Sequence, residues 1–322
     1  MVIRAHCAPM LIGAITLLNV LAAQAAAGGI DEARVSIQPR AKAAAPSDIR
    51  VDSNLVVIPV SVTDPKNRPV TGLAPDEFRV FEGKAEQKVL RLSSEDAPLS
   101  VGIVFDASGS MAGKLPKARE AVKEFLKSAN PDDEFFLVNF SRTPELAVPF
   151  TNNPGDIQMR LMYATTGGRT ALLDGISLAL ECMKNAKNPR RALLVISDGG
   201  DNHSRYTETE IRRRVQETDV SIYAIGIYTR GIQIFPEEER GGEKLLTDVA
   251  EASGGRQFAV EKASELPAAA AAIGLELRSQ YLLAYHPDNV EPDGKYRRVQ
   301  VKLVEQRGMR LSWRPGYYAP GQ

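Results

Sequence analysis

The chain has 322 residues, and at about 150 residues per domain this length predicts two domains. Hydrophobic residues make up 43% and charged residues 25%, which excludes a wholly disordered, collagen-like or multi-span membrane chain. The 40 Lys and Arg residues balance 40 Asp and Glu residues, so the usual electrostatic basis for nucleic-acid binding is absent. Two cysteines are too few for a disulfide-stapled scaffold or a cysteine-rich zinc site.

Residues 1–25 have the pattern of a secretory signal peptide. Arg4 is the only Lys, Arg, Asp or Glu before Asp31, residues 10–23 are apolar, and Ala-Gln-Ala at 23–25 fits the cleavage pattern. The apolar run is short for a bilayer span. We therefore expect export to the periplasm or out of the cell, with no membrane span left after cleavage. An uncleaved membrane anchor is the alternative. Residues 26–50, rich in Ala, Gly and Pro, are expected to form a flexible leader.

A β segment is predicted next, at 51–97. Residues 55–63 and 78–81 are short runs rich in β-branched and aromatic side chains, and a third strand is expected at 89–92. The tripeptide Glu-Gly-Lys at 82–84 is expected to turn the chain between the second and third strands. Because three strands are too few for a core of their own, they need partners elsewhere in the chain.

From 98 to 280, buried strands alternate with amphipathic helices. The strands are expected at 99–105, 134–140, 145–150, 192–196, 220–227 and 258–260. The helices are expected at 114–129, 153–163, 170–185, 207–218, 244–252 and 264–279, the last capped by Ser264. This alternation predicts an α/β fold with a doubly wound, mostly parallel sheet flanked by helices.

The β pattern returns at 281–320. Strands are predicted at 281–285, 296–304 and 309–313, with turns at Asp293-Gly294 and Arg307-Gly308. The simplest assembly pairs these strands with those of 51–97. The α/β domain at 98–280 is then inserted into, or flanked by, a small β-sandwich-like domain built from both segments.

Five oxygen-bearing side chains follow or precede elements of the α/β domain. Asp106, Ser108 and Ser110 follow its first strand, and a spacing of two directs all three to one side of an extended loop. Thr170 opens a helix, and Asp198 follows the fourth strand. Taken singly, each has an ordinary interpretation as a turn or cap residue.

Together, the five side chains indicate a metal site. Open α/β sheets bind ligands at the carboxyl ends of their strands, where the strand order reverses, and we expect the five to meet there. Two carboxylates and three hydroxyls, with no His or Cys, suit a hard divalent cation. Mg²⁺ is the first candidate and Mn²⁺ the second.

This pattern resembles the von Willebrand factor type A domain, whose metal-ion-dependent adhesion site has the motif D-x-S-x-S…T…D. The segments VGIVFDASGSM at 101–111, GGRTALLDG at 167–175 and LLVISDG at 193–199 look like strand-and-loop signatures of that family. The corner at 250–258 looks like its last helix-to-strand corner. The resemblance covers about 99–280.

The whole layout is similar to the VWFA-related domain family of exported bacterial proteins known from Acidobacteria. The shared features are the signal peptide, the stretches PVTGL at 69–73 and DEF at 76–78, and the closing RPGYY at 314–318. All five metal positions of the adhesion-site motif are present.

The resemblance implies a binding module and not an enzyme. By analogy with the family, Ser108, Ser110 and Thr170 supply direct or near-direct oxygens to the metal, and Asp106 and Asp198 often act through water. The metal then keeps an open position for a carboxylate from a partner protein. The implied function is metal-bridged adhesion.

Two alternatives stay open. A metal-dependent phosphohydrolase of the aspartyl-nucleophile type also places an Asp after the first strand, but Ser108 stands where that chemistry needs a second carboxylate. Lys114, the nearest Lys for a phosphate, is expected on a solvated helix start. A metal-free structural scaffold of the cell envelope is the second alternative.

A long loop is predicted at 229–242, and it is the candidate partner contact. It exceeds the usual length of such a connection. Apolar Ile232, Ile234 and Phe235 lie beside Glu237, which belongs to an acidic run. A solvated surface loop is the alternative interpretation. Cys182 lies in the apolar pattern of a helix, so burial is expected there in place of reactivity.

Overall fold

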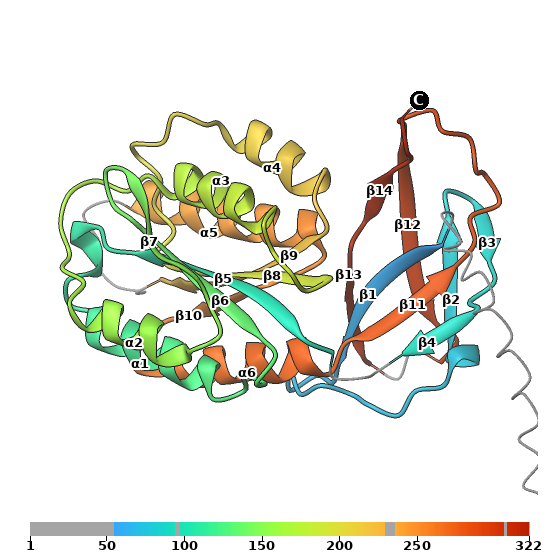
Figure 1. Ribbon diagram of the computed structural model, residues 1–322, viewed down its shortest axis with the longest axis horizontal. Coiled ribbons are helices and arrows are strands. Elements are labelled where there is room, and N and C mark those ends of the chain that lie inside the picture. Colours follow the sequence, from blue (N-terminus) through green and yellow to red (C-terminus); the bar gives the residue numbers. More distant parts are fainter. Residues whose placement is uncertain (1–54, 94–96, 229–235, 306–307, 322) are drawn as a thin grey trace, which may run out of the picture. The chain divides into compact units, whose positions relative to one another are not determined.

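Figure 1 shows the computed structural model of the chain, which describes residues 55–93, 97–228, 236–305 and 308–321. All of these residues belong to one compact unit. The signal peptide predicted at 1–25 and the leader predicted at 26–50 lie outside the described residues.

A six-stranded sheet forms the centre of the α/β domain. Its strands are β5 (Leu99–Asp106), β6 (Glu134–Phe140), β7 (Pro144–Thr151), β8 (Arg190–Ser197), β9 (Val220–Ile227) and β10 (Gln257–Val260). The order is β10-β9-β8-β5-β6-β7, and every neighbouring pair is parallel except β6 and β7. Every residue of β5, β6 and β9 is buried, which accounts for their apolar runs.

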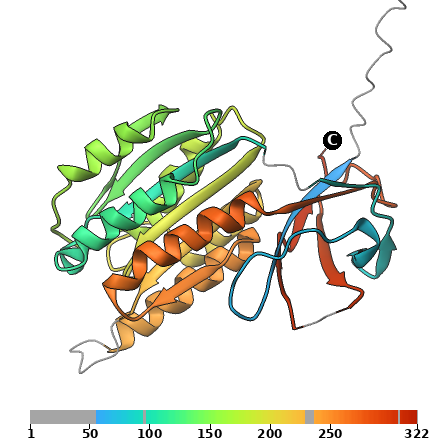
Figure 2. The same cartoon turned by 90° about the horizontal axis from the view of Figure 1, so that it is seen from below.

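Helices cover both faces of this sheet. They are α1 (Leu115–Leu126), α2 (Pro154–Met162), α3 (Leu172–Met183), α4 (Glu208–Gln216), α5 (Pro236–Ser253) and α6 (Leu266–Arg278). Helices α1, α2 and α6 lie on one face and α3, α4 and α5 on the other (Figure 1), and each set closes a separate hydrophobic core. Figure 2 shows α6 running beside α1. The predicted doubly wound, mostly parallel α/β fold is confirmed.

Two four-stranded antiparallel sheets enclose a third core. Their strands are β1 (Val56–Thr63), β2 (Phe78–Glu82), β3 (Ala85–Gln87), β4 (Arg91–Ser93), β11 (Tyr281–Tyr285), β12 (Tyr296–Leu303), β13 (Arg310–Trp313) and β14 (Gly316–Tyr318). The orders are β13-β1-β11-β4 and β14-β12-β2-β3. Strand β1 pairs with β11 and β13, and β2 pairs with β12. Strands from before and after the α/β domain therefore share both sheets and one core.

The connections between these β strands differ from the prediction. Gly83, with a φ of 60°, turns the chain from β2 into β3, a strand that was not predicted. The strand expected at 89–92 is β4, which belongs to the other sheet. The turn at Asp293-Gly294 likewise lies between strands of different sheets. Strand β14 was also not predicted, because three residues carry too little periodicity to be recognised.

Two helix starts also differ from the prediction. Helix α5 begins at Pro236, so the predicted loop at 229–242 is helical from that residue onward. Proline suits the first position of a helix. Ser264 does not cap α6, because it lies within a 3-10 turn (Ala263–Glu265) that precedes the helix.

The predicted partner-contact residues cannot be located in this fold. Ile232, Ile234 and Phe235 lie outside the described residues, and so does the side chain of Glu237 in α5. Cys182 on α3 is half-buried, and burial raises the pKa of its thiol.

Candidate metal centre

The candidate site lies where β5 and β8 end side by side. The chain leaves β5 for β6 on one side and later returns to place β8 on the other, so the strand order reverses at β5. Asp106 is the last residue of β5, and Asp198 directly follows β8. The two predicted carboxylates therefore lie at the crevice where sheets of this kind bind ligands.

Asp106 is fully buried and held by two hydrogen bonds. Its Oδ1 accepts from the Ser108 amide at 2.8 Å, and its Oδ2 accepts from Ser197 Oγ at 2.6 Å. Burial, together with the negative charge of Asp198, raises the pKa of Asp106 to about 6. The site therefore holds more negative charge than its surroundings stabilise, and it favours a cation.

Ser108 and Ser110 come together through a short 3-10 helix (Gly109–Met111). Ser108 is buried, Ser110 is exposed, and their Oγ atoms lie 3.0 Å apart. Met111 is fully buried and anchors this turn in the hydrophobic core. One hydroxyl thus lies inside the site and the other lies at its solvent-facing edge.

Thr170 lies in a second loop, which is bonded to the other two. The Gly167 amide donates to the carbonyl of Ala107 at 2.9 Å, and the Gly109 amide donates to the carbonyl of Gly168 at 3.2 Å. On the other side, the Thr170 amide donates to Asn202 Oδ1 at 3.0 Å. Thr170 itself is buried. The structure therefore brings together the three loops that carry all five predicted residues.

Lys114 belongs to this cluster, contrary to the expectation of a solvated helix start. Its Nζ lies 2.9 Å from Asp198 Oδ2, with 21% of the Lys114 side chain and 9% of the Asp198 side chain exposed. Lys114 immediately precedes α1, at its N-cap position. The ammonium group shows that the carboxylate cluster attracts a positive charge.

The chemistry of these donors fits a hard divalent cation. Carboxylate and hydroxyl oxygens are the ligands that Mg²⁺ and Mn²⁺ prefer. Among the residues that the structure describes, no cluster of three or more His, Cys, Asp or Glu side chains offers a competing metal site. The Lys114 ammonium competes with any cation bound here, because both draw on the negative charge of Asp198.

Sequence reasoning missed three supporting residues. Ser197 fixes Asp106 and also accepts from the Gly199 amide at 3.0 Å, and Asn202 fixes the backbone of Thr170. Lys114 lies eight positions after Asp106. The adjacency of Ser197 to Asp198 was a usable signal, whereas the contacts of Asn202 and Lys114 depend on loop conformation.

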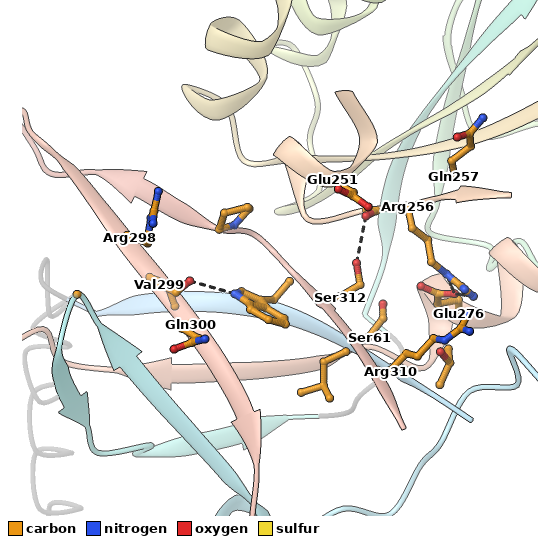
Figure 3. Close-up of a pocket in the computed structure, with 16 residues that line it drawn as sticks. Ser61, Glu251, Arg256, Gln257, Glu276, Arg298, Val299, Gln300, Arg310 and Ser312 are labelled. Atoms are coloured by element: carbon orange, nitrogen blue, oxygen red, sulfur yellow. Dashed lines mark hydrogen bonds and ion pairs between the residues drawn. The ribbon is translucent and has the colours of Figure 1, made fainter. Parts of the chain in front are cut away.

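A cavity of about 790 Å³ lies elsewhere, at the junction of the α/β domain and the β sheets (Figure 3). Its lining includes none of the five predicted residues. Two of its charged groups neutralise each other, since Arg256 Nε donates to Glu276 Oε2 at 2.8 Å. Ser312 Oγ donates to the carbonyl of Gly254 at 2.9 Å across the same junction. The Ser312 contact joins strand β13 to the α/β domain, whereas the Arg256–Glu276 pair lies within that domain.

Comparison with known proteins places the region of the candidate site in a known domain family. The family model of the von Willebrand factor type A domain matches residues 101–200, which include all five candidate residues. An uncharacterised protein of Borreliella burgdorferi is 28% identical over 153 residues, covering 44% of each chain. The inter-alpha-trypsin inhibitor heavy chain H2 of Sus scrofa is 25% identical over 219 residues, which cover 62% of this chain. The chain spans 44% and 23% of the length of these two curated relatives.

Solved structures share the fold. A von Willebrand factor type A protein from Catenulispora acidiphila aligns with a TM-score of 0.50 and 14% identity, over 85% of this chain and 75% of that one. Proximal thread matrix protein 1 from the mussel byssus aligns with a TM-score of 0.50 and 18% identity, over 61% and 51% of the two chains. A further structure of the mussel protein is described with a zinc-occupied MIDAS motif, the metal-ion-dependent adhesion site. The chain carries a von Willebrand factor type A domain.

Proposed function

We propose that this chain is an exported protein-binding module that holds Mg²⁺, or Mn²⁺, at a metal-ion-dependent adhesion site. Asp106, Ser108, Ser110, Thr170 and Asp198 are the proposed metal residues. Domains of this family often bind a metal at this motif, and they generally bind proteins without catalysing a reaction. The observation that carries the proposal is the convergence of the three loops on the edge shared by β5 and β8.

The proposed metal residues have two roles: some hold negative charge, and others leave the site open to a partner. Asp106 is fixed by Ser108 and Ser197, so its charge is available without any rearrangement of the loop. Ser110 is exposed, which leaves the outer side of the site open to solvent and to a partner. When bound, the metal supplies an electrophilic position that accepts a carboxylate oxygen from the partner protein. The chain's own side chains then orient this contact without breaking a bond.

Calorimetry with Mg²⁺ and Mn²⁺ tests the site. The native chain should bind a divalent cation, and Asp106→Ala and Ser108→Ala should lose that binding. Asp132→Ala is the matched control, because Asp132 is exposed and precedes β6 at the opposite edge of the sheet. A folded native chain that binds neither cation would contradict the proposal and would favour the metal-free scaffold.

The partner contact at 232–237 remains part of the proposal. Because α5 begins at Pro236, we propose replacing residues 232–235 alone with a Gly/Ser linker. Partner capture should fall while cation binding measured by calorimetry persists. Loss of both together would show that the exchange had damaged the domain, and unchanged capture would remove this segment from the partner surface.

Export also remains a proposal, since it rests on residues 1–25. Cell fractionation of the full chain in a bacterial host, beside a chain that starts at residue 26, tests it. Retention of the full chain in the cytoplasm would contradict it. Among the residues that the structure describes, no helix is both long enough and apolar enough to cross a membrane.

A further inference from the structure

A groove of about 720 Å³ opens beside the candidate metal centre. It lies between the loop after β6, helix α3 and the loop that leads into α4, and its lining includes Arg142, His203 and Arg205. It adjoins the site through backbone bonds. The Ala171 amide donates to the carbonyl of Ser141 at 2.8 Å, and the His203 amide donates to the carbonyl of Thr170 at 3.1 Å.

Arg142 connects the groove to the metal loops. Its side chain lies over Gly168, so that a Cβ built on Gly168 would meet Arg142 Cγ at 3.4 Å. Gly168 in turn accepts the hydrogen bond of Gly109, the residue between Ser108 and Ser110. Arg142 is therefore separated from the proposed metal residues by one layer of backbone.

The groove carries positive charge that its own carboxylates do not neutralise. Asp174 is buried and bonded to Arg205, whose amide and Nε donate at 2.9 and 3.1 Å. Glu181 pairs with Lys184. The exposed guanidinium of Arg142 has neither a hydrogen bond nor an ion pair within the part of the chain that the structure describes.

Arg214 adds a second positive charge to the lining of the groove. It donates to Ser177 Oγ at 3.0 Å and stacks on the Tyr206 ring at 4.5 Å, which fixes its position. No ion pair with a carboxylate is present for it among the described residues. A fixed positive groove next to a cation site selects for acidic groups and against basic ones.

We propose that this groove binds a second acidic side chain of the partner, close in sequence to the one directed to the metal. The inference rests on the proposed function and names its partner class, an exposed segment with two neighbouring Asp or Glu residues. In an extended segment, alternate side chains point the same way and lie about 7 Å apart, so one strand-like segment can place one carboxylate at the metal and the next at Arg142.

Short synthetic peptides test the inference. The probes are capped, fluorescently labelled peptides: Gly-Asp-Gly-Gly-Gly with one acid, and Gly-Asp-Gly-Asp-Gly and Gly-Asp-Gly-Gly-Asp with two. Binding is measured by fluorescence anisotropy at saturating Mg²⁺, and again with chelator. At least one two-acid peptide should bind roughly tenfold more tightly than the one-acid peptide, and the gain should shrink with added salt.

The variant Arg142→Gln should reduce the two-acid peptides to the affinity of the one-acid peptide while leaving the one-acid peptide unchanged. Arg213→Gln is the matched control, because Arg213 is an exposed α4 residue paired with Glu217. Equal affinity of all three peptides, or a two-acid gain that survives Arg142→Gln in the folded variant, overturns the inference. If the inference is overturned in either way but the one-acid peptide still binds only with Mg²⁺, the proposed function stands. If it shows no Mg²⁺-dependent binding, both fail.

Discussion

Lys114 Nζ lies 2.9 Å from Asp198 Oδ2, and both side chains are largely shielded from water. The ion pair joins the start of α1 to the loop after β8, two elements separated by 84 positions in the chain. A shielded ammonium on a proposed metal residue acts as a competitor, because the ammonium and a bound cation would draw on the same negative charge of Asp198. The strength of metal binding therefore depends on Lys114 as well as on the five oxygen donors.

Replacing Lys114 with Met should tighten Mg²⁺ binding. The change removes the competing charge and keeps the length of the side chain. A hydrogen bond to a charged group contributes about 1.5 kcal/mol, so we expect roughly a tenfold lower dissociation constant by calorimetry. Lys117→Met is the control, since Lys117 is half-exposed and pairs with Glu120. Weaker binding in Lys114→Met would show that the ammonium supports the site.

The raised pKa of Asp106 predicts a pH-dependent cost in the metal-free protein. The folded pKa is about 6 and the ordinary value is 3.8, so the native state binds more protons between these two values. Its contribution to stability is complete below pH 3.8 and is lost as the pH rises through about 6. The loss is on the order of 3 kcal/mol.

Asp106→Asn tests this linkage without metal. The variant should unfold at a higher urea concentration than the native chain near pH 7, and the difference should vanish at about pH 4, where the native Asp106 is itself protonated. Asp132→Asn, at an exposed position, is the control. A variant that is less stable than the native chain across this range would mean that the hydrogen bonds to the carboxylate outweigh the cost of burying its charge.

Gly242 in α5 supports the loop that carries Asp198. A Cβ on Gly242 would overlap the carbonyl oxygen of Gly199, a residue that itself adopts a φ of 84°. Gly242→Ala should therefore shift this loop and weaken Mg²⁺ binding by roughly tenfold or more. Gly241→Ala is the matched control, because a Cβ there meets nothing within 4 Å. Equal Mg²⁺ affinity of the two variants would show that the loop shifts without weakening metal binding.

Tyr223 is the centre of the polar contact between the two parts of the molecule. Its hydroxyl lies 3.1 Å from Ser61 Oγ of β1 and 3.2 Å from Glu276 Oε1 of α6, and it accepts from Gln280 Nε2 at 3.1 Å. Tyr223→Phe leaves these buried groups with one partner fewer, so the free energy of unfolding should fall by about 1–3 kcal/mol in urea titration. Tyr318→Phe, at an exposed position, should change it little. An unaltered stability of Tyr223→Phe would mean that water replaces the hydroxyl.

The sequence was sufficient for the α/β domain because its signals are long and local. Runs such as 99–105 and 220–227 are mostly apolar, which is typical of strands buried on both faces. The proximity of the proposed metal residues was predictable for a related reason. Parallel strands end at a common edge, so residues that follow β5 and β8 meet whatever the loops do.

The remaining features depend on tertiary contacts that no local pattern encodes. Strands β3, β4 and β14 have three residues each, and β4 and β14 pair with strands that are not their neighbours in the chain. The partner of Lys114 is 84 positions away. The early start of α5 was not predicted, because Gly241 and Gly242 resemble the end of a helix. Both lie inside α5, where Gly242 packs against Gly199.

Arg190, the first residue of β8, determines how the α/β domain would carry a pulling force. Its guanidinium donates to the carbonyl of Ala97, just before β5, at 3.2 Å and to that of Leu277 in the last turn of α6. These two residues lie where the chain enters the α/β domain from the β sheets and where it is about to leave it. Beyond them, β4 and β11 are paired neighbours, with Ser93 opposite Leu282. The chain thus enters the α/β domain before β5 and leaves it after α6 at the same edge of the sheet, opposite Asp106. Tension applied by a partner at the metal edge would run along the parallel strands and divide between the two connections, which Arg190 holds together. Neither end of the domain would then detach before the other.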